Sequence, residues 1–409
     1  MDGTNMGRLN RLSLSLEERA ELSSKVDAAA SAAKLRSLLV VGSANIAYLT
    51  GGVVFPYLDQ RMTHPVALHI NFASGRRTIL CTADLVDIPG DCGWDGEVLL
   101  YELVEPTPEQ ALAHAIQSVI SRDGNSGASI GFDAIHMSGG LHRALTDCMP
   151  DRRFHAIDGF MRDLRITKTS AEIRMLEIAA RIGDRGYISA LNHAEGAALD
   201  RLSFPLWEYA ERFRVHVGEF EGSGVGNLAV MQGQRAQDLQ HRIGTREVFE
   251  DQSYLRLEYS MSNRGYWNAG SRTAYVGKPG ANARQCYADN LTLRTSAVDA
   301  LTAGARACDV FHAVKAASVR LSIPFWEEAE LGHGVGTSER EAPYLAPHDM
   351  TILRADMVVT LGVYTFGENR ELICNRDLYR VRDGRAELLS WYKDWNYLYP
   401  IHGTSARHG

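Results

Sequence analysis

The pattern of apolar residues changes once along this chain, near residue 160, and that change constrains the fold more than any other feature. Before residue 160, short apolar runs of strand length alternate with segments rich in Ala, Leu and Glu, which favour helices. Strands that alternate with helices are typical of an α/β domain. At 409 residues the chain is too long for one ordinary core. We therefore expect an α/β domain over residues 1–160 and a second packed domain over residues 161–409.

The second half opens with a helix signal and then becomes strand-like. Thr169 and Glu172 have the spacing of a capping box at the start of a helix. Apolar or small side chains then recur on one helical face: Ile173, Leu176, Ala179, Ala180 and Gly183. After residue 215 the sequence predicts strands, above all in "EVFEDQSYLRLEYSMSNRGYW" and "RTAYVG", followed by a helical stretch and further strands.

Composition and charge argue against several classes of partner. The net charge of −7 indicates neither nucleic acid nor an acidic membrane surface. No window reaches the roughly 18 consecutive apolar residues of a membrane span, and the start has no apolar core of signal-peptide length. Six cysteines without a CxxC pair argue against a zinc ribbon or a dense disulfide framework. We expect a cytoplasmic protein without nucleic-acid or membrane partners.

Five segments carry a resemblance to one enzyme family, and they follow that family's order along the chain. They are "VGSANIAYLTGG", "ITKTSAEIRMLEIAARI", "GYWNAGSRTAYVGKP", "ELGHGVGTSEREAPYL" and "ADMVVTLGVY". Together they resemble the pita-bread fold family of creatinase, aminopeptidase P, prolidase and methionine aminopeptidase, over nearly the whole chain. The resemblance implies a creatinase-like N-terminal α/β domain, an α+β pita-bread C-terminal domain of the catalytic type, and a homodimer.

The resemblance also says where a metal centre would lie. The family's peptidases hold two divalent metals with two aspartates, a histidine and two glutamates, a donor set that suits metals activating a bridging water. These positions fall here on Glu258, Ala269, His333, Gly362 and Asn375. Alanine and glycine have no donor side chain, so the remaining residues cannot build a dinuclear site. We predict no metal and no other cofactor, although Glu258 with His333 could hold one adventitious ion weakly.

Creatinase resembles the peptidases in fold but hydrolyses its small substrate without metal, through a histidine general acid/base assisted by glutamates. The segment "QHRIGTREVFEDQSYLRLE" aligns with its catalytic-histidine region and places that histidine on His241. The arginine that grips the substrate carboxylate falls on Arg340, which Glu341 follows. The two catalytic glutamates would fall on Ser271 and Gly362, which are not carboxylates, so the creatinase reaction itself is not implied.

Each candidate also has a structural alternative. A histidine titrates near neutrality, so His241 suits a proton shuttle, or it is an ordinary loop histidine. His333 lies in "GHGVG", where glycines let the backbone approach a ligand or simply form a turn. Glu258 lies in an apolar strand, so it either faces a pocket or forms an ion pair. Arg340 has a fork that suits a carboxylate, or it is a surface residue.

The N-terminal domain contributes two further candidates. Arg61 and His64 lie in "LDQRMTHP", and the corresponding creatinase segment reaches the partner subunit's site. They are otherwise residues of an exposed loop. The complete predicted site has His241, His333 and Glu258 as catalytic residues, and Arg340, Glu341, Ser271, Asn375, Arg61 and His64 as residues that bind a small substrate with a carboxylate.

Three functions from different classes remain open. The first is a metal-independent enzyme that hydrolyses a C–N bond of a small carboxylate-bearing nitrogen compound, with His241 as general acid/base. The second is a lyase, a decarboxylase or a rearrangement enzyme, because one fold hosts many chemistries. The third is a catalytically inactive pita-bread protein that binds proteins or peptides, which the compact outline without a charged tail disfavours.

Overall fold

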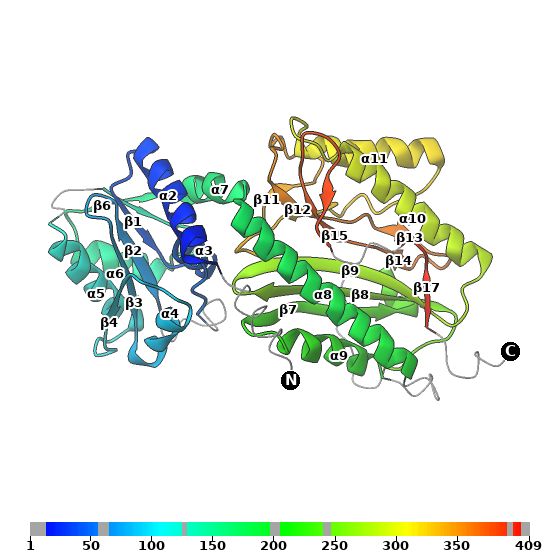
Figure 1. Ribbon diagram of the computed structural model, residues 1–409, viewed down its shortest axis with the longest axis horizontal. Helices are drawn as coiled ribbons and strands as arrows, with labels where there is room; N and C mark the ends of the chain where they lie inside the picture. Colours follow the sequence, from blue (N-terminus) through cyan, green and yellow to red (C-terminus); the bar gives the residue numbers. More distant parts are fainter. Residues whose placement is uncertain are drawn as a thin grey trace. The chain divides into compact units, whose positions relative to one another are not determined.

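The structure is a computed structural model that describes residues 14–55, 65–124, 129–196, 205–239, 247–390 and 396–401. The chain divides into two compact units, residues 1–165 and residues 166–409 (Figure 1). The boundary expected at residue 160 falls inside helix α7, Asp158–Ile166. Within the described ranges, no helix is both long enough and apolar enough to cross a lipid bilayer.

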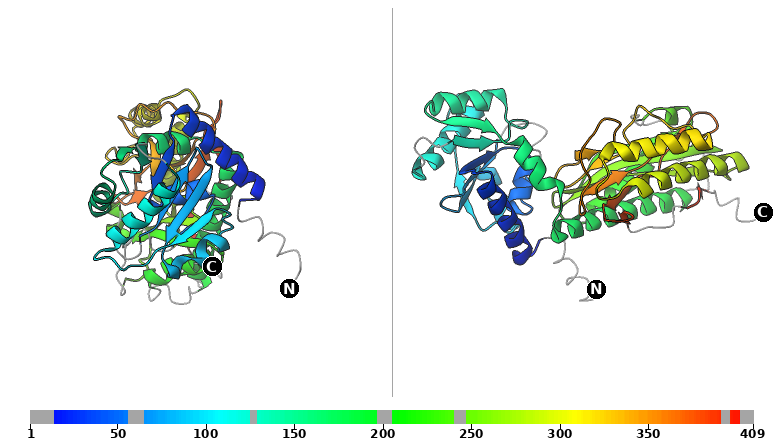
Figure 2. Two further views of the ribbon diagram at one scale, coloured as in Figure 1. Left: turned by 90° about the vertical axis from the view of Figure 1, so that its left-hand side faces the viewer. Right: turned by 90° about the horizontal axis from the view of Figure 1, so that it is seen from above.

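The N-terminal unit is a mixed six-stranded sheet in the order β4-β3-β2-β1-β5-β6. Helices α5 and α6 pack on one face, where Leu80 of β3 joins the buried core. Helix α2 lies on the other face, where Arg77 of β3 pairs with Asp27 of α2 at 2.9 Å (Figure 2). The elements are α2 Leu16–Ala32, β1 Ser37–Val40, α3 Ser43–Thr50, β2 Ala67–Asn71, β3 Arg76–Cys81, a 3-10 turn Ala83–Leu85, α4 Asp87–Asp91, β4 Glu97–Leu100, α5 Pro108–Arg122, β5 Ser129–Phe132, α6 Gly139–Cys148 and β6 Arg153–Ala156.

The C-terminal unit is built on two larger sheets and four long helices. Helices α8 and α9 pack on the sheet β17-β9-β8-β7, and α10 and α11 pack on the sheet β11-β10-β12-β15-β16. The elements are α8 Ser170–Gly196, α9 Leu206–Gly218, β7 Ser223–Gln232, a 3-10 turn Gly233–Gln237, β8 Ser253–Asn263, β9 Tyr266–Val276, α10 Ala281–Ala300, α11 Ala307–Leu321, β10 His333–Gly334, β11 Glu341–Tyr344, β12 Val358–Leu361, β13 Thr365–Phe366, β14 Leu372–Ile373, β15 Asp377–Arg380, β16 Glu387–Leu388 and β17 Tyr399–Ile401.

The predicted capping box is present at the start of α8. The backbone N–H of Glu172 donates to Oγ1 of Thr169 at 3.2 Å, and the backbone N–H of Thr169 donates to Oε2 of Glu172 at 2.9 Å. These two bonds satisfy N–H groups that have no partner inside a helix. The apolar face that follows is buried as predicted, with Leu176 and Ala179 fully enclosed.

A tight hairpin sets the register of β8 and β9. Arg264 and Gly265 both have positive φ, at 47° and 83°, as a two-residue turn of type I′ requires. The turn pairs Asn263 with Tyr266, and every later pair follows from it. Side chains alternate between the faces of a strand, so Leu255, Leu257, Tyr259 and Met261 of β8 join the core under the helices. Arg256, Glu258 and Ser260 lie on the opposite face.

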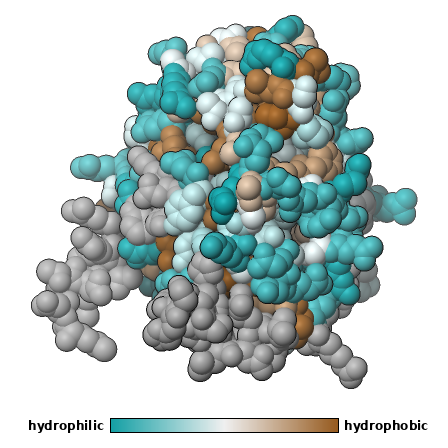
Figure 3. Space-filling view, turned by 90° about the vertical axis from the view of Figure 1, so that its right-hand side faces the viewer, coloured by the Kyte–Doolittle hydropathy of each residue, from teal (hydrophilic) through white to brown (hydrophobic). Residues whose placement is uncertain are grey.

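Figure 3 shows one face of the molecule in hydropathy colours. The described side chains on that face are mainly hydrophilic, and the hydrophobic ones lie in small separate groups. Isolated apolar residues of this kind are normal on a protein surface and do not mark a binding site. The buried polar side chains of the C-terminal unit are therefore the better candidates for a site.

Candidate active site

The positions that match the family's metal ligands meet where β8, β9 and the start of β15 lie side by side. Glu258 of β8 lies opposite Ser271 of β9. The backbones of Ser271 and Arg376 exchange two N–H···O bonds, of 2.9 and 3.4 Å. Directly paired residues carry their side chains on the same face of a sheet. Glu258, Ser271 and Arg376 therefore form one row, and Ala269, opposite Ser260, lies in the next row.

Glu258 is paired inside the protein, at 7% exposure. Its Oε1 accepts a hydrogen bond of 2.7 Å from the Tyr364 hydroxyl and lies 3.3 Å from Nε of Arg256. Burial raises the pKa of Tyr364 well above its usual value, so the phenol stays protonated and can donate. A buried carboxylate is costly unless paired. The ion pair, one of the two alternatives for Glu258, is present.

Arg256 ties three parts of the site together. Its guanidinium is fully buried and donates to the carbonyl oxygens of Leu372 and Leu239, each at 3.1 Å. Its Cζ lies 5.3 Å from the centre of the Tyr364 ring, a cation–π distance. Arg256 therefore positions Glu258, Tyr364 and the backbone at Leu239.

Arg376 lies in this cluster of side chains, although the sequence did not single it out. Its Cζ lies 5.5 Å from the centre of the Tyr364 ring. Its Nε is buried without an acceptor, and no carboxylate of the described chain forms an ion pair with it. The predicted site residues were positions that match functional residues of the family, and Arg376 lies one residue beyond one of them, Asn375. An available signal was a charged residue in an apolar run, "LICNRDLY".

His333 offers one open ring nitrogen. The residue is 4% exposed, and its Nδ1 lies 3.0 Å from the Gly334 carbonyl oxygen. A carbonyl only accepts, so Nδ1 carries the proton and Nε2 keeps its lone pair. Burial, and then the positive charge of Arg376, lowers the pKa of His333 to about 4. The ring is therefore neutral at pH 7 and can accept a hydrogen bond at Nε2.

A two-metal centre does not fit these residues. Ala269 and Gly362 have no donor atom. A Cβ at position 362 would lie only 2.8 Å from Cβ of Arg376 and 3.0 Å from Sγ of Cys374, so the space for a ligand side chain is already filled. Burial raises the pKa of Cys374 to about 11, so this neighbour is a neutral thiol and a poor metal ligand. The absence of a metal therefore stays a prediction, based on the residue types at these positions.

One group of three metal-binding side chains was found among the described residues, and it includes none of these positions. It consists of Cys308, Asp309 and His312 at the start of α11. Asp309 already accepts from the backbone N–H of Arg306 at 2.9 Å and from its Nη2 at 2.7 Å. The carboxylate therefore caps the helix, which explains its position without a metal.

Two predicted substrate-binding residues are engaged in ion pairs with the protein. Nη2 of Arg340 lies 2.6 Å from Oε2 of Glu330, and the Arg340 side chain is 57% exposed. Oε1 of Glu341 lies 2.6 Å from Nζ of Lys168, and both side chains are largely buried. Arg340 is thus a surface residue, one of the two alternatives given for it. Glu341 stabilises the start of α8 through Lys168.

Ser271 and Asn375 support the sheets. The Ser271 hydroxyl is buried and donates to the Cys374 carbonyl at 3.3 Å. Asn375 is fully buried, accepts from the Tyr287 hydroxyl at 3.3 Å and donates to Asn290 at 3.3 Å. These contacts occupy both side chains and leave them poorly placed for substrate. The predicted residues His241, Arg61 and His64 lie outside the described residues.

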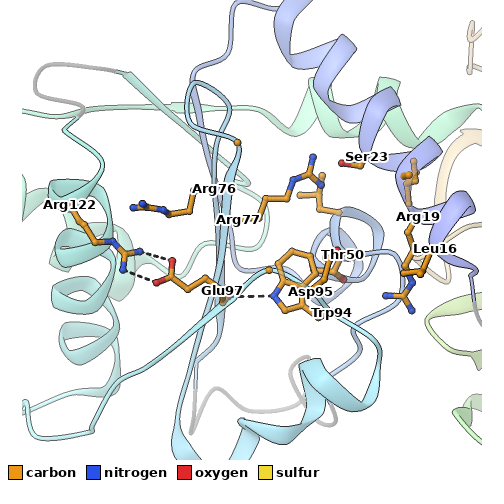
Figure 4. Close-up of a pocket in the computed structure, with 15 residues that line it drawn as sticks. Leu16, Arg19, Ser23, Thr50, Arg76, Arg77, Trp94, Asp95, Glu97 and Arg122 are labelled. Atoms are coloured by element: carbon orange, nitrogen blue, oxygen red, sulfur yellow. Dashed lines mark hydrogen bonds and ion pairs between the residues drawn. The ribbon is translucent and has the colours of Figure 1, made fainter.

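A separate cavity of about 720 Å³ lies in the N-terminal unit (Figure 4). Its lining includes Trp94 and four arginines, which would suit an anionic ligand if their charges were free. Each arginine has protein partners: Arg122 with Glu97, Arg76 with Asp123, Arg77 with Asp27, and Arg19 with the carbonyls of Cys92 and Gly93. Three of the four charges are therefore paired with a carboxylate, and the donors of Arg19 are engaged by backbone carbonyls.

The two-unit architecture, and the order of these positions along the chain, are those of a pita-bread protein of the creatinase and aminopeptidase P type. Residues 174–383 match the model of metallopeptidase family M24, and residues 23–167 match the creatinase/prolidase N-terminal domain. The chain therefore belongs to metallopeptidase family M24, which confirms both the resemblance and the predicted fold class.

Two curated relatives are Xaa-Pro dipeptidases. The Xaa-Pro dipeptidase of Pyrococcus furiosus is 26% identical over 215 residues, 52% of this chain and 60% of that protein. The Xaa-Pro dipeptidase of Lactobacillus delbrueckii subsp. lactis is 22% identical over 342 residues, 82% of this chain and 90% of that protein. The chain thus spans about 60% of the length of the Pyrococcus dipeptidases that it matches.

Solved structures show the same fold at low identity. The X-Pro aminopeptidase of Thermotoga maritima superposes with a TM-score of 0.78 at 16% identity and covers 92% of this chain and 99% of its own. The Pyrococcus horikoshii prolidase gives 0.74 at 18%, with 91% and 99% covered. The N-terminal domain of the FACT complex subunit SPT16 from chickpea gives 0.69 at 13%, with 92% and 98% covered. These structures support the fold alone.

Proposed function

We propose that this protein is a metal-independent enzyme that hydrolyses a C–N bond in a small carboxylate-bearing nitrogen compound. One observation carries the proposal: residues without a donor side chain stand at positions where the family has metal ligands. Ala269 and Gly362 have no donor. The guanidinium of Arg376 lies 5.5 Å from the centre of the Tyr364 ring, whose hydroxyl donates to Glu258. A guanidinium at this place repels a divalent cation and attracts an anion.

The residues support a division of roles. His333 accepts a hydrogen bond at Nε2 from a substrate N–H or from water, and its pKa of about 4 makes it a weak base. His241 therefore remains our proposal for the general acid/base. In the proposed reaction, His241 takes a proton from water, the hydroxide adds to the carbon of the C–N bond, and the nitrogen leaves with the proton.

Peptide hydrolysis is the main competitor, because the relatives are Xaa-Pro dipeptidases. The test uses purified full-length protein after dialysis against a chelator, with metal content measured by mass spectrometry. Carboxylate-bearing amides, amidines and cyclic amidines are offered in chelator, and Xaa-Pro dipeptides are offered with and without Mn²⁺. The variant His241→Gln is the catalytic control.

Turnover in chelator that His241→Gln abolishes would support the proposal. Xaa-Pro turnover that needs Mn²⁺ and about two metals per chain would overturn it. Reaction in ¹⁸O-water separates the remaining classes. Label in the product indicates hydrolysis, turnover without label indicates a lyase or rearrangement, and binding without turnover indicates an inactive binding protein.

A further inference from the structure

The side chains around Tyr364 carry one more positive charge than negative charge. We call this group the Tyr364 cluster, and its members are Tyr364, Arg256, Glu258, Arg376 and His333. Arg256 and Glu258 neutralise each other at 3.3 Å, and Tyr364 is a neutral donor to Glu258. His333 is a neutral ring. The one positive charge left over in the cluster is therefore that of Arg376.

The charged residues next to the cluster do not change this balance. Glu330 is paired with Arg340 at 2.6 Å, and Glu341 is paired with Lys168 at 2.6 Å. Arg376 is half-buried, and its Nε has no acceptor, although Glu258 and Glu330 lie near enough to act on its charge. Among the described residues no carboxylate forms an ion pair with Arg376, so its charge is available to an anion that binds there.

The protein holds Arg376 in place without using its charge. Its backbone N–H donates to Ser271 at 2.9 Å, and its carbonyl accepts from Nη1 of Arg272 at 2.5 Å. The guanidinium contacts the ring of Tyr364, whose hydroxyl is fixed in turn by Glu258. A side chain ordered in this way loses little conformational freedom when a ligand arrives.

We propose that Arg376 is an anion-binding residue that holds the carboxylate of a small monoanionic ligand. A single guanidinium can present two parallel N–H donors to one carboxylate. The single excess charge of the cluster matches a monocarboxylate, whereas a phosphate dianion would leave the site negative. The identity of this group as the substrate carboxylate rests on the proposed function, but the anion site itself does not.

This assignment replaces Arg340, the residue that the sequence favours. Arg340 is exposed and already carries Glu330. The arginines of the N-terminal cavity are likewise paired (Figure 4). Arg376 differs from all of them because its Nε has no acceptor and no carboxylate among the described residues forms an ion pair with it.

The experiment is an equilibrium titration of the full-length protein with sodium propionate, in chelator and in a buffer low in chloride. Propionamide is the neutral ligand of the same shape, and inorganic phosphate is the dianion. The variants are Arg376→Met and Arg376→Lys, with Arg340→Met as the competing assignment. Arg320→Met removes an exposed arginine of α11 and is the matched control.

Propionate should bind the wild-type protein and propionamide should not. Arg376→Met should weaken propionate binding at least about tenfold, the effect of losing a charge-assisted bidentate pair. Arg376→Lys should bind more weakly than wild type and more tightly than Arg376→Met. Arg320→Met should bind as wild type does. Thermal unfolding checks each variant, and Arg376→Lys decides the matter if Arg376→Met does not fold.

Four results would overturn the inference. They are unchanged binding in Arg376→Met, a loss in Arg340→Met without one in Arg376→Met, tighter binding of phosphate than of propionate, and no binding of propionate to the wild-type protein. Propionate has no C–N bond, so its binding does not depend on turnover. A protein that binds propionate through Arg376 but hydrolyses nothing would refute the proposed function alone.

Discussion

Arg272 and Arg376 lie close together in the C-terminal unit and differ in one respect. Nη2 of Arg272 lies 2.8 Å from Asp184 and 2.6 Å from Asp377, and all three side chains are buried. Arg376 immediately precedes Asp377 in the sequence, yet it has no carboxylate partner among the described residues. The comparison teaches that partners, not residue type, separate an arginine that holds the fold from one that is open to a ligand.

The largest expected effect comes from removing the paired arginine. Arg272→Met leaves Asp184 and Asp377 buried with their main counter-ion gone, so it should lower the free energy of unfolding by about 3–5 kcal/mol. Arg376→Met leaves no such carboxylate and should change that free energy by less than about 1 kcal/mol. Urea unfolding of both variants measures the difference, and equal losses would break the comparison.

The second expected effect is a loss of stability in acid that depends on His333. Its folded pKa of about 4 is below the unfolded value near 6.5, so the folded state binds fewer protons between these values. The contribution of neutral His333 to the free energy of unfolding is fully present above pH 6.5 and is lost as the pH falls toward 4. Between pH 7 and pH 5 the loss should be about 2 kcal/mol.

Urea unfolding at pH 7 and pH 5 tests the role of His333. The variant His333→Asn should show a smaller loss between the two values than wild type. Burial also lowers the pKa of His69 in the N-terminal unit to about 4; Asp123 opposes this shift and Arg122 adds to it. His69 is unchanged in His333→Asn, so its share of the pH dependence should remain in that variant. An unchanged pH dependence in His333→Asn would contradict the assigned environment.

The third effect concerns the hydrogen bond between Tyr364 and Glu258. Tyr364→Phe removes the donor 2.7 Å from Oε1 but leaves Arg256 beside the carboxylate. We expect a loss of about 1 kcal/mol in the free energy of unfolding, the net value of one hydrogen bond. Thermal and urea unfolding measure it. No loss at all would mean that Glu258 relies on Arg256 alone.

The smallest effect is expected in the N-terminal cavity, where the arginines are partly exposed. Arg122→Met breaks a two-fold pair with Glu97, both bonds being 2.7 Å. Because both side chains are more than a third exposed, the change in the free energy of unfolding should stay below about 1 kcal/mol. A loss as large as that of Arg272→Met would show that burial does not determine how much free energy of unfolding is lost when an ion pair is broken.

The sequence predicted those features that depend on local chemistry. The capping box of Thr169 and Glu172 is a contact between near neighbours, and the alternation around Glu258 is a property of one strand. The family resemblance extended this to the whole fold. The places of Glu258, Ala269 and Gly362 in the sheets follow from that resemblance and from the hairpin register.

Arg340, which the sequence favoured, and Arg376, which it did not single out, show where the sequence was insufficient. Nothing in "SEREA" reveals that Glu330, ten residues earlier, lies 2.6 Å from Arg340. Nothing in "CNRD" reveals that Asp377 pairs with Arg272 and Arg294 rather than with its neighbour Arg376. Both outcomes depend on which side chains meet across separate strands, and a single sequence does not encode that in its spacing.

The crowding at Gly362 has a consequence for how such a site can evolve. A glutamate there would collide with Cβ and Cα of Arg376 and with Cys374, so that change alone would be harmful before any metal could reward it. Every residue keeps its Cα, so replacing Arg376 alone would not open this space. The backbone around residue 376 would have to move before a glutamate could fit at position 362, so a return to metal binding needs a backbone change as well as new ligands.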